Sequence, residues 1–169
     1  MPANERFNAL VHAWSADHYR FAYWLTRDRP GAEDLVQEAY LRAWRALATL
    51  RDEQAAKSWL FSIVRNEYRR RWKSLKPAPS DAMEEPADGS DALQDWLVRR
   101  HLQALPEDYR EPLLLQVLGG FSCEEIADML EVSRATVMTR LFRAHLKLRA
   151  ALTGAASRPA PREKRHELS

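Results

Sequence analysis

Short polar and basic side chains recur between positions 134 and 147 with the types and spacing that duplex DNA recognition requires. They are Arg134, Ala135, Thr136, Thr139, Arg140, Arg143 and Lys147. On a helix, residues three or four positions apart share a face. In the DNA major groove, arginines bond guanine edges and phosphates, while threonine and alanine contact other base edges. This segment therefore predicts a helix that binds duplex DNA.

The surrounding sequence, residues 121–149, is typical of a helix-turn-helix. Ser122 and Ser133 each precede a helical pattern and can cap it by accepting a backbone N–H. Glu131 occupies the turn position where a glycine often relieves a positive φ, so we expect slight strain there. The expected internal core consists of Ile126, Leu130, Val132, Val137 and Leu141. The alternative is an ordinary helical hairpin whose charged face is only solvated.

A second basic segment, residues 58–73, interleaves aromatic rings with arginines and predicts binding of unpaired bases. Its candidate contact residues are Trp59, Arg65, Asn66, Arg69, Arg70 and Trp72. Aromatic rings stack on exposed bases, and arginines follow the phosphates of a single strand. In the alternative interpretation, the aromatic side chains belong to the core and the arginines only solubilise the helix. The residues alone leave both interpretations open.

The apolar residues recur at helical spacing along the chain, which predicts an all-α fold. We expect two small helical domains joined by a flexible acidic linker, the second containing the helix-turn-helix. In the first domain, one helix should span about 4–27 and the last should end near residue 73. The stretch 77–95 holds acidic residues, prolines and no Lys or Arg, as linkers do. The expected boundaries are 1–76 for the first domain, 77–92 for the linker, 93–152 for the second domain and 153–169 for a disordered basic tail.

The composition narrows the class of protein. With 169 residues, 46% of them hydrophobic, the chain can build packed cores, and its net charge of +2 does not by itself indicate a nucleic-acid partner. The single cysteine, Cys123, excludes an internal disulfide, and a redox role for its thiol is a minor alternative. We find no signal peptide and no apolar run near the ~20 residues of a membrane helix, so we expect a cytoplasmic protein without membrane insertion. No nucleophile–base pair, phosphate-binding loop or metal cluster stands out, so we expect no enzyme, no cofactor and no metal.

Three blocks of the sequence, in register, resemble bacterial sigma factors of the sigma-70 family, and most of all the small extracytoplasmic-function (ECF) class. They are DLVQEAYLRAWRAL (34–47), SWLFSIVRNEYRRRW (58–72) and the segment 105–149. The resemblance implies a protein that binds the beta and beta-prime subunits of core RNA polymerase and directs the enzyme to promoters. It also implies that the first domain holds the minus-ten element as a melted strand and that the second reads the minus-thirty-five element as duplex DNA.

The same resemblance implies further contact residues and partners. The residues that fall on the polymerase-docking helix are Asp34, Leu35, Gln37, Glu38 and Leu41. The loop 50–57 corresponds to the segment that captures a flipped base, and the acidic linker would run toward the polymerase active site. An anti-sigma factor that holds the protein inactive until a stress or signal arrives is an expected partner.

Three other functions remain as alternatives at this point. A stand-alone helix-turn-helix regulator would bind a palindromic duplex as a dimer without polymerase, although residues 1–76 are too short and too helical for a typical receiver domain. An enzyme acting on nucleic acid would need clustered carboxylates or metal ligands. A helical adaptor would use its amphipathic faces only for protein partners.

Overall fold

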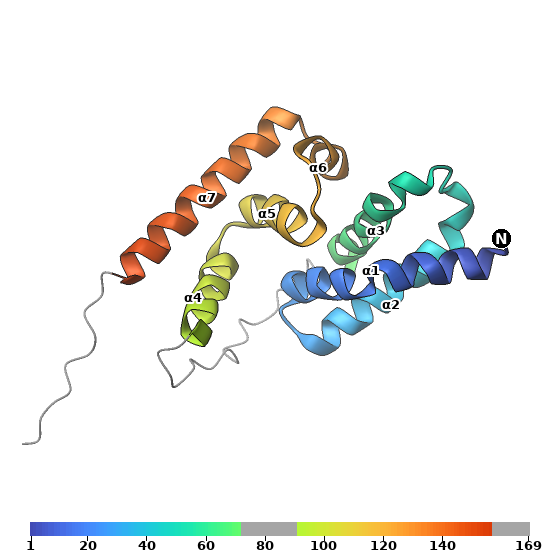
Figure 1. Cartoon of the computed structure of the whole chain (residues 1–169), viewed down its shortest axis with the longest axis horizontal. Helices are drawn as coiled ribbons and strands as arrows, with labels where there is room; N and C mark the ends of the chain where they lie inside the picture. The colour runs from blue at the N-terminus through green and yellow to red at the C-terminus, as the bar shows by residue number, and fades with distance from the viewer. Residues whose placement is uncertain (72–90, 157–169) are drawn as a thin grey trace, which may run out of the picture.

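The structure is a computed structural model that describes residues 1–71 and 91–156. Within these two ranges the chain is helical and has no strand, which confirms the expected all-α fold. The first range holds α1 (Ala3–Thr26), α2 (Arg29–Ala46), the 3-10 turns η1 (Leu47–Thr49) and η2 (Glu53–Ala55), and α3 (Ala56–Arg71). The second range holds α4 (Asp91–Ala104), α5 (Glu107–Gly119), α6 (Cys123–Leu130) and α7 (Arg134–Ala156) (Figure 1).

The helix ends lie close to the predicted ones, with two differences. α4 begins at Asp91, so the last two residues of the expected linker are helical. α7 continues to Ala156, past the expected end of the second domain at residue 152. Trp72, the rest of the expected linker up to residue 90 and the part of the expected tail from residue 157 lie outside the described residues.

Local signals in the sequence set the turn between α1 and α2. α1 ends where Arg27 adopts a left-handed conformation with φ of 56°, and its N–H bonds the Tyr23 carbonyl at 2.7 Å. α2 begins immediately afterwards because the Asp28 carboxylate accepts the Gly31 N–H at 2.8 Å and Pro30 stands in the first turn. This short connection makes α1 and α2 antiparallel neighbours, and α3 packs against both.

A histidine is buried in the middle of this three-helix unit. His18 of α1 is fully buried, and its Nδ1 shares a hydrogen bond of 2.9 Å with the Tyr40 hydroxyl of α2. Burial, together with the nearby charge of Lys57, lowers the pKa of His18 to about 4. Burial also raises the pKa of Tyr40 to about 12. Both side chains are therefore neutral at physiological pH and pack as part of the core.

The second helical unit ends in the helix-turn-helix. α5 stops at Gly120, whose φ of 66° suits a left-handed cap. Ser122 and Glu125 form a reciprocal capping box that starts α6. α6 ends at Glu131, whose φ of 56° confirms the positive value expected from the sequence. Ser133 then accepts the Thr136 N–H at 3.1 Å and starts α7.

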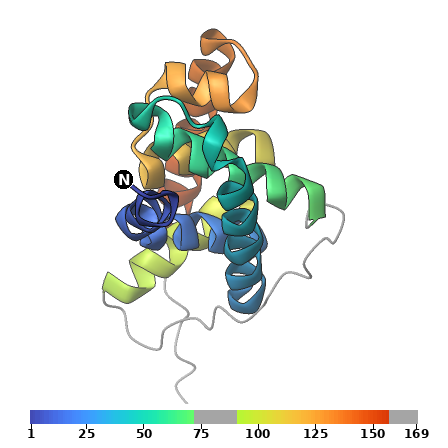
Figure 2. The same ribbon diagram turned by 90° about the vertical axis from the view of Figure 1, so that its right-hand side faces the viewer.

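The two helical units lie side by side, with α5 and α6 facing α1 and α3 (Figures 1 and 2). One cluster of buried apolar residues continues from α1, α2 and α3 into α5, α6 and α7. Across the junction, the rings of Phe61 and Phe121 meet edge to face with their centroids 5.1 Å apart. A second, smaller cluster around Leu10, Leu50 and Leu60 lies within the first unit. None of the described helices has the length and apolar character needed to cross a membrane.

Candidate nucleic-acid interface

The candidate duplex-binding residues all lie on the accessible side of α7. Val137, Leu141 and Ala144 are buried on the opposite side and pack against the rest of the unit. The exposed candidates are Arg134, Ala135, Thr139, Arg143 and Lys147. Thr136 and Arg140 are half-buried at the edge of the same face. The structure therefore leaves all seven side chains at least partly accessible on one helix, as contact with a DNA groove requires.

Neighbouring side chains orient two of these arginines. Arg134 at the start of α7 pairs with Glu124 of α6, Nε to Oε1, at 2.8 Å. Arg143, nine residues further along, donates to the Tyr109 hydroxyl of α5 at 3.4 Å. Sequence reasoning missed both partners. Glu124 and Tyr109 lie on other helices than the two arginines. Each pair therefore forms only because α5 and α6 pack against α7.

The candidate strand-binding residues on α3 divide into an exposed and an enclosed group. Asn66, Arg69 and Arg70 are exposed. Trp59 is half-buried against the smaller core cluster, so this ring fits the core interpretation in part. Arg65 has only 6% of its surface exposed because it lies under the second unit, where it forms an ion pair with Glu111 of α5. In this arrangement the Arg65 guanidinium contacts a carboxylate of the same chain and does not face the solvent.

A buried carboxylate fixes the arginines at the end of α3. Glu67 is 1% exposed and pairs with Arg42 of α2 and, at 2.7 Å, with Arg70 one turn further along α3. The hydrogen bond to Glu67 raises the pKa of Arg70. Arg71 forms an ion pair of 3.3 Å with Glu38. These contacts tie α3 to α2 and leave the exposed edge of the helix rich in positive charge.

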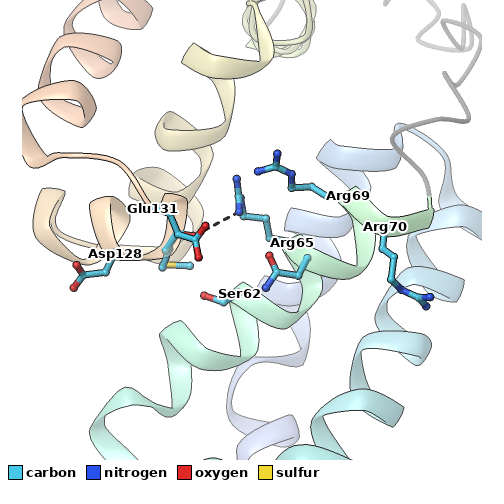
Figure 3. A pocket seen from close by; sticks show the side chains of 8 residues that line it. Ser62, Arg65, Arg69, Arg70, Asp128 and Glu131 are labelled. Carbon is cyan, nitrogen blue, oxygen red and sulfur yellow. Dashed lines mark hydrogen bonds between the residues drawn. The ribbon is translucent and has the colours of Figure 1, made fainter.

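An open pocket of about 560 Å³ lies between α3 and α6. Its lining residues are Ser62, Arg65, Asn66, Arg69, Arg70, Asp128, Met129 and Glu131. In Figure 3, Arg65 and Arg69 lie on the α3 side and Glu131 on the α6 side. Four of the six candidate strand-binding residues thus line one hollow, and the opposite wall carries negative charge.

The candidate polymerase-docking residues lie on α2, and one of them needs a correction. Asp34, Gln37 and Leu41 are exposed, and Glu38 is half-exposed on the same side. Leu35, by contrast, is fully buried among α1, α2 and α3. It was assigned by its place in the block, but helical spacing turns it toward the core. Leu35 is therefore a packing residue and has no surface to offer a partner.

An exposed tryptophan extends this surface. Trp44 follows Leu41 by three positions, and the two side chains are 44% and 52% exposed. Exposed large apolar side chains next to each other on a helix are typical of a protein interface. The helical spacing of the apolar residues on α2 groups Trp44 with Ala43 and Leu47, which are buried, and so predicts a core position that the structure does not bear out. The spacing of Gln37, Leu41 and Trp44 was the signal that could have found it.

Two known sequence families match the two helical units. Residues 10–77 match the family Sigma-70 region 2, and residues 96–148 match the family Sigma-70, region 4. The chain belongs to the sigma-70 family. Together the two matches take in α3 with its arginines and the helix-turn-helix with α7.

Curated relatives place the protein in the ECF class. It is 31% identical over 152 residues to the ECF RNA polymerase sigma factor SigM of Bacillus subtilis (strain 168). The match covers 83% of this chain and 91% of SigM. It is 32% identical over 159 residues to the ECF RNA polymerase sigma-E factor of Escherichia coli (strain K12), with 82% of each chain covered. The chain is thus an ECF RNA polymerase sigma factor, a regulatory protein of transcription initiation.

Solved structures agree with this assignment. The sigma factor RpoE, in its co-crystal structure with the anti-sigma factor NepR from Bartonella quintana, matches with a TM-score of 0.73 and 28% identity, covering 88% of this chain and 98% of RpoE. CnrH in complex with the cytosolic domain of CnrY matches with a TM-score of 0.66 and 25% identity, covering 89% of this chain and 90% of CnrH. The stand-alone dimeric regulator is not favoured, because both sigma regions are present in one chain.

Proposed function

We propose that the two helical units of this ECF sigma factor hold two different forms of promoter DNA. The first unit, residues 1–76, binds the minus-ten element as a melted strand, and the second, residues 93–152, binds the minus-thirty-five element as duplex. The observation that carries the proposal is the presence of two separate basic surfaces, on α3 and on α7. The α3 surface lines a hollow, and the α7 surface belongs to an exposed helix, as single-strand and major-groove binding require.

In this proposal the arginine-rich end of α3 grips the opened strand. Asn66 and Arg69 are exposed beside each other, and Arg70 is oriented by the buried Glu67. Melting a base pair costs a few kcal/mol per unstacked base, which contacts to the extruded strand must offset. A few arginines and one half-buried tryptophan supply little of this energy. We therefore assign most of the promoter affinity to the complex with polymerase.

The exposed side of α2 docks on core RNA polymerase. Asp34, Gln37, Glu38 and Leu41 supply polar and apolar contacts, and Trp44 enlarges the apolar part. Tryptophan and other large side chains at the centre of an interface often provide most of its binding energy. Because transcription takes place in the cytoplasm of bacteria, we infer that the protein acts there.

We further propose that an anti-sigma factor controls this protein. The two solved relatives are each in complex with a partner chain, the anti-sigma factor NepR in one case and the cytosolic domain of CnrY in the other. The exposed apolar side chains Val117, Met138, Phe142 and Leu146 of α5 and α7 offer a partner a surface on the second unit. Affinity capture from unstressed cells that recovers no inhibitory protein would argue for control by expression instead.

The decisive experiment is transcription in vitro with purified core polymerase and a library of promoter sequences. We expect defined start sites only when the sigma factor is added, and no tight promoter binding by the sigma factor alone. Leu41→Glu should weaken binding to core polymerase by about tenfold or more, about 1.4 kcal/mol, because it places a charge in an apolar contact. Ala16→Glu adds the same charge at an exposed position of α1 and should leave binding unchanged. Unaltered start sites in the presence of the protein would refute the proposal.

A further inference from the structure

We propose that Phe7 of α1 is a positioning residue for polymerase binding, because its ring holds the Trp44 indole of α2 in place on the docking surface. The inference rests on the proposed docking of α2 on core RNA polymerase and assigns part of that binding to a second helix. Phe7 acts through Trp44 and not through a polymerase contact of its own. It fixes the conformation of an exposed side chain before the partner arrives.

Trp44 is an exposed side chain whose polar group is not used within the described protein. Its indole N–H has no hydrogen-bond acceptor among residues 1–71 and 91–156. An indole combines a large apolar surface with one donor, and the donor usually finds a partner when the ring is buried. Trp44 follows Leu41 by three positions and Gln37 by seven, so the three side chains share a face of α2. A partner that covers this face can use both the ring and the N–H.

The ring contact that holds Trp44 comes from the start of α1. The ring centroids of Phe7 and Trp44 are 5.4 Å apart and their planes are inclined at 72°, which is an edge-to-face contact. Within the described ranges, no other aromatic ring contacts Trp44. Because α1 and α2 are antiparallel neighbours, the start of α1 meets the end of α2, where Trp44 lies. A single aromatic residue of another helix therefore supports the exposed indole.

Phe7 is itself held by contacts on two sides. Its ring meets that of Tyr40, one turn before Trp44 on α2, with the centroids 6.3 Å apart and the planes perpendicular. Tyr40 is in turn fixed by its hydrogen bond to the buried His18. On its other side, Phe7 packs against the smaller apolar cluster of the first unit. Phe7 thus lies between two rings of α2 and is anchored to the core on which α2 rests.

The neighbouring residue Arg6 fixes the same end of α1. Its Nη2 donates to the Leu50 carbonyl at 2.8 Å, and its Nε pairs with the Glu53 carboxylate. Helix ends fray easily because their terminal groups lack partners within the helix. The two bonds of Arg6 tie the start of α1 to the segment between α2 and α3, so that Phe7 stays against Trp44.

Fixing Trp44 in advance lowers the cost of binding a partner. An exposed side chain without neighbours occupies several staggered rotamers, and an interface immobilises it in one of them. Ordering one large side chain on binding corresponds to about three- to tenfold in affinity. In this protein the contact with Phe7 restricts the ring of Trp44 during folding. Polymerase therefore meets a side chain that is already ordered.

The test measures the affinity of the full chain for core polymerase in a set of variants. Phe7→Leu keeps an apolar side chain over the smaller cluster but removes the ring, and should weaken binding about three- to tenfold. Phe7→Tyr keeps the ring and should bind as the wild type does. Trp14→Leu is the matched control, because Trp14 is half-buried against the same cluster and makes no ring contact with Trp44 in the described structure. It should lower the free energy of unfolding, measured with urea, without weakening binding.

A double-mutant cycle separates positioning from direct contact. Trp44→Leu should weaken binding by about tenfold or more. In that background Phe7→Leu should cause no further loss, because two residues that act through one contact are not additive. Fluorine NMR of protein labelled with 5-fluorotryptophan gives an independent readout. The Trp44 signal, assigned by its absence in Trp44→Leu, should shift in Phe7→Leu and stay in place in Trp14→Leu.

Four results would overturn the inference. An equal loss from Phe7→Leu with and without Trp44 would show that Phe7 acts independently of the indole. Weaker binding by Trp14→Leu at the same loss of stability would assign the effect to general destabilisation. If Trp44→Leu binds core polymerase normally while Leu41→Glu does not, the inference fails and the proposed docking of α2 stands. If neither of these two substitutions weakens binding, the proposed docking fails and the inference falls with it.

Discussion

Glu67 of α3 and Arg42 of α2 form an ion pair in which the carboxylate is buried and the guanidinium is about half exposed. The pair connects the helix proposed to grip the DNA strand to the helix proposed to dock on polymerase. Arg70 completes the site on the other side of the same carboxylate. A movement of α2 on binding polymerase would therefore also change the position of Arg70 on α3, because both helices contribute to this site.

We expect Glu67→Gln to destabilise the protein by about 1–3 kcal/mol, because charge-assisted hydrogen bonds to a buried carboxylate are lost. The free energy of unfolding from urea titrations measures the effect. Glu53→Gln removes the carboxylate of the surface ion pair with Arg6 and should cost less than about 1 kcal/mol. If the two substitutions lowered the free energy of unfolding equally, the burial of Glu67 would contribute nothing to stability.

The buried His18 predicts a particular dependence of stability on pH. Its pKa is about 4 in the folded protein against 6.5 in the unfolded chain, so only the unfolded state gains a proton between these values. Stability should therefore be complete above pH 6.5 and fall as the pH drops toward 4, by about 3 kcal/mol in total. Unfolding free energies measured across this range test the prediction.

His18→Gln should flatten this part of the pH profile, because the substituted side chain does not titrate. His12→Gln, at an exposed position of the same helix, serves as the control and should keep the slope of the wild type. A slope that persists in His18→Gln would assign the acid sensitivity to other groups.

On α7, two basic residues should differ in what they contribute to DNA binding. Arg140→Ala should reduce discrimination among promoter sequences by about 1–3 kcal/mol, as expected for an arginine that bonds a guanine edge. Lys147→Ala, near the distal end of the face, should weaken binding to all sequences alike and reduce its dependence on salt. Transcription from a promoter library at several salt concentrations separates the two effects. Equal losses on all sequences for Arg140→Ala would make it a phosphate contact.

Two glycines on helices should respond in opposite directions to the same substitution. A methyl group on Gly119 would meet the Phe121 ring at 2.3 Å, so Gly119→Ala must displace that ring and destabilise the junction of the units. A methyl group on Gly154 of α7 would meet nothing within 4 Å, and Gly154→Ala should stabilise the protein by about 0.5–1 kcal/mol. Thermal unfolding of both variants gives the comparison, and a stable Gly119→Ala protein would contradict the packing described.

The parts of the fold that short-range chemistry determines were predictable from the sequence. The caps at Ser122 and Ser133 and the positive φ of Glu131 all depend on residues within one helical turn. The periodicity of apolar residues likewise gave the helices and the accessible face of α7. For these features, side-chain type and spacing are sufficient because the interacting groups are neighbours along the chain.

The contacts between distant segments could not be predicted in the same way. Nothing near Arg65 in the sequence indicates that Glu111 will pair with it, since the pair forms only when α5 packs against the first unit. Leu35 is a different kind of error, because the helical spacing of Leu35, Ala39 and Ala43 already indicated a buried face, whereas its place in a matching block suggested a contact residue. Trp44 could be on either side by spacing alone. Burial depends on how helices are placed in three dimensions, which single-helix patterns do not contain.

The apolar cluster that runs through both helical units has a thermodynamic consequence. Because Phe61 and Phe121 share one core, loss of either unit exposes part of the other to water. Heating should therefore melt the molecule in one calorimetric transition, with an enthalpy that reflects the combined size of both regions. Although the chain contains two separate sigma regions, the isolated protein should unfold as a single cooperative unit.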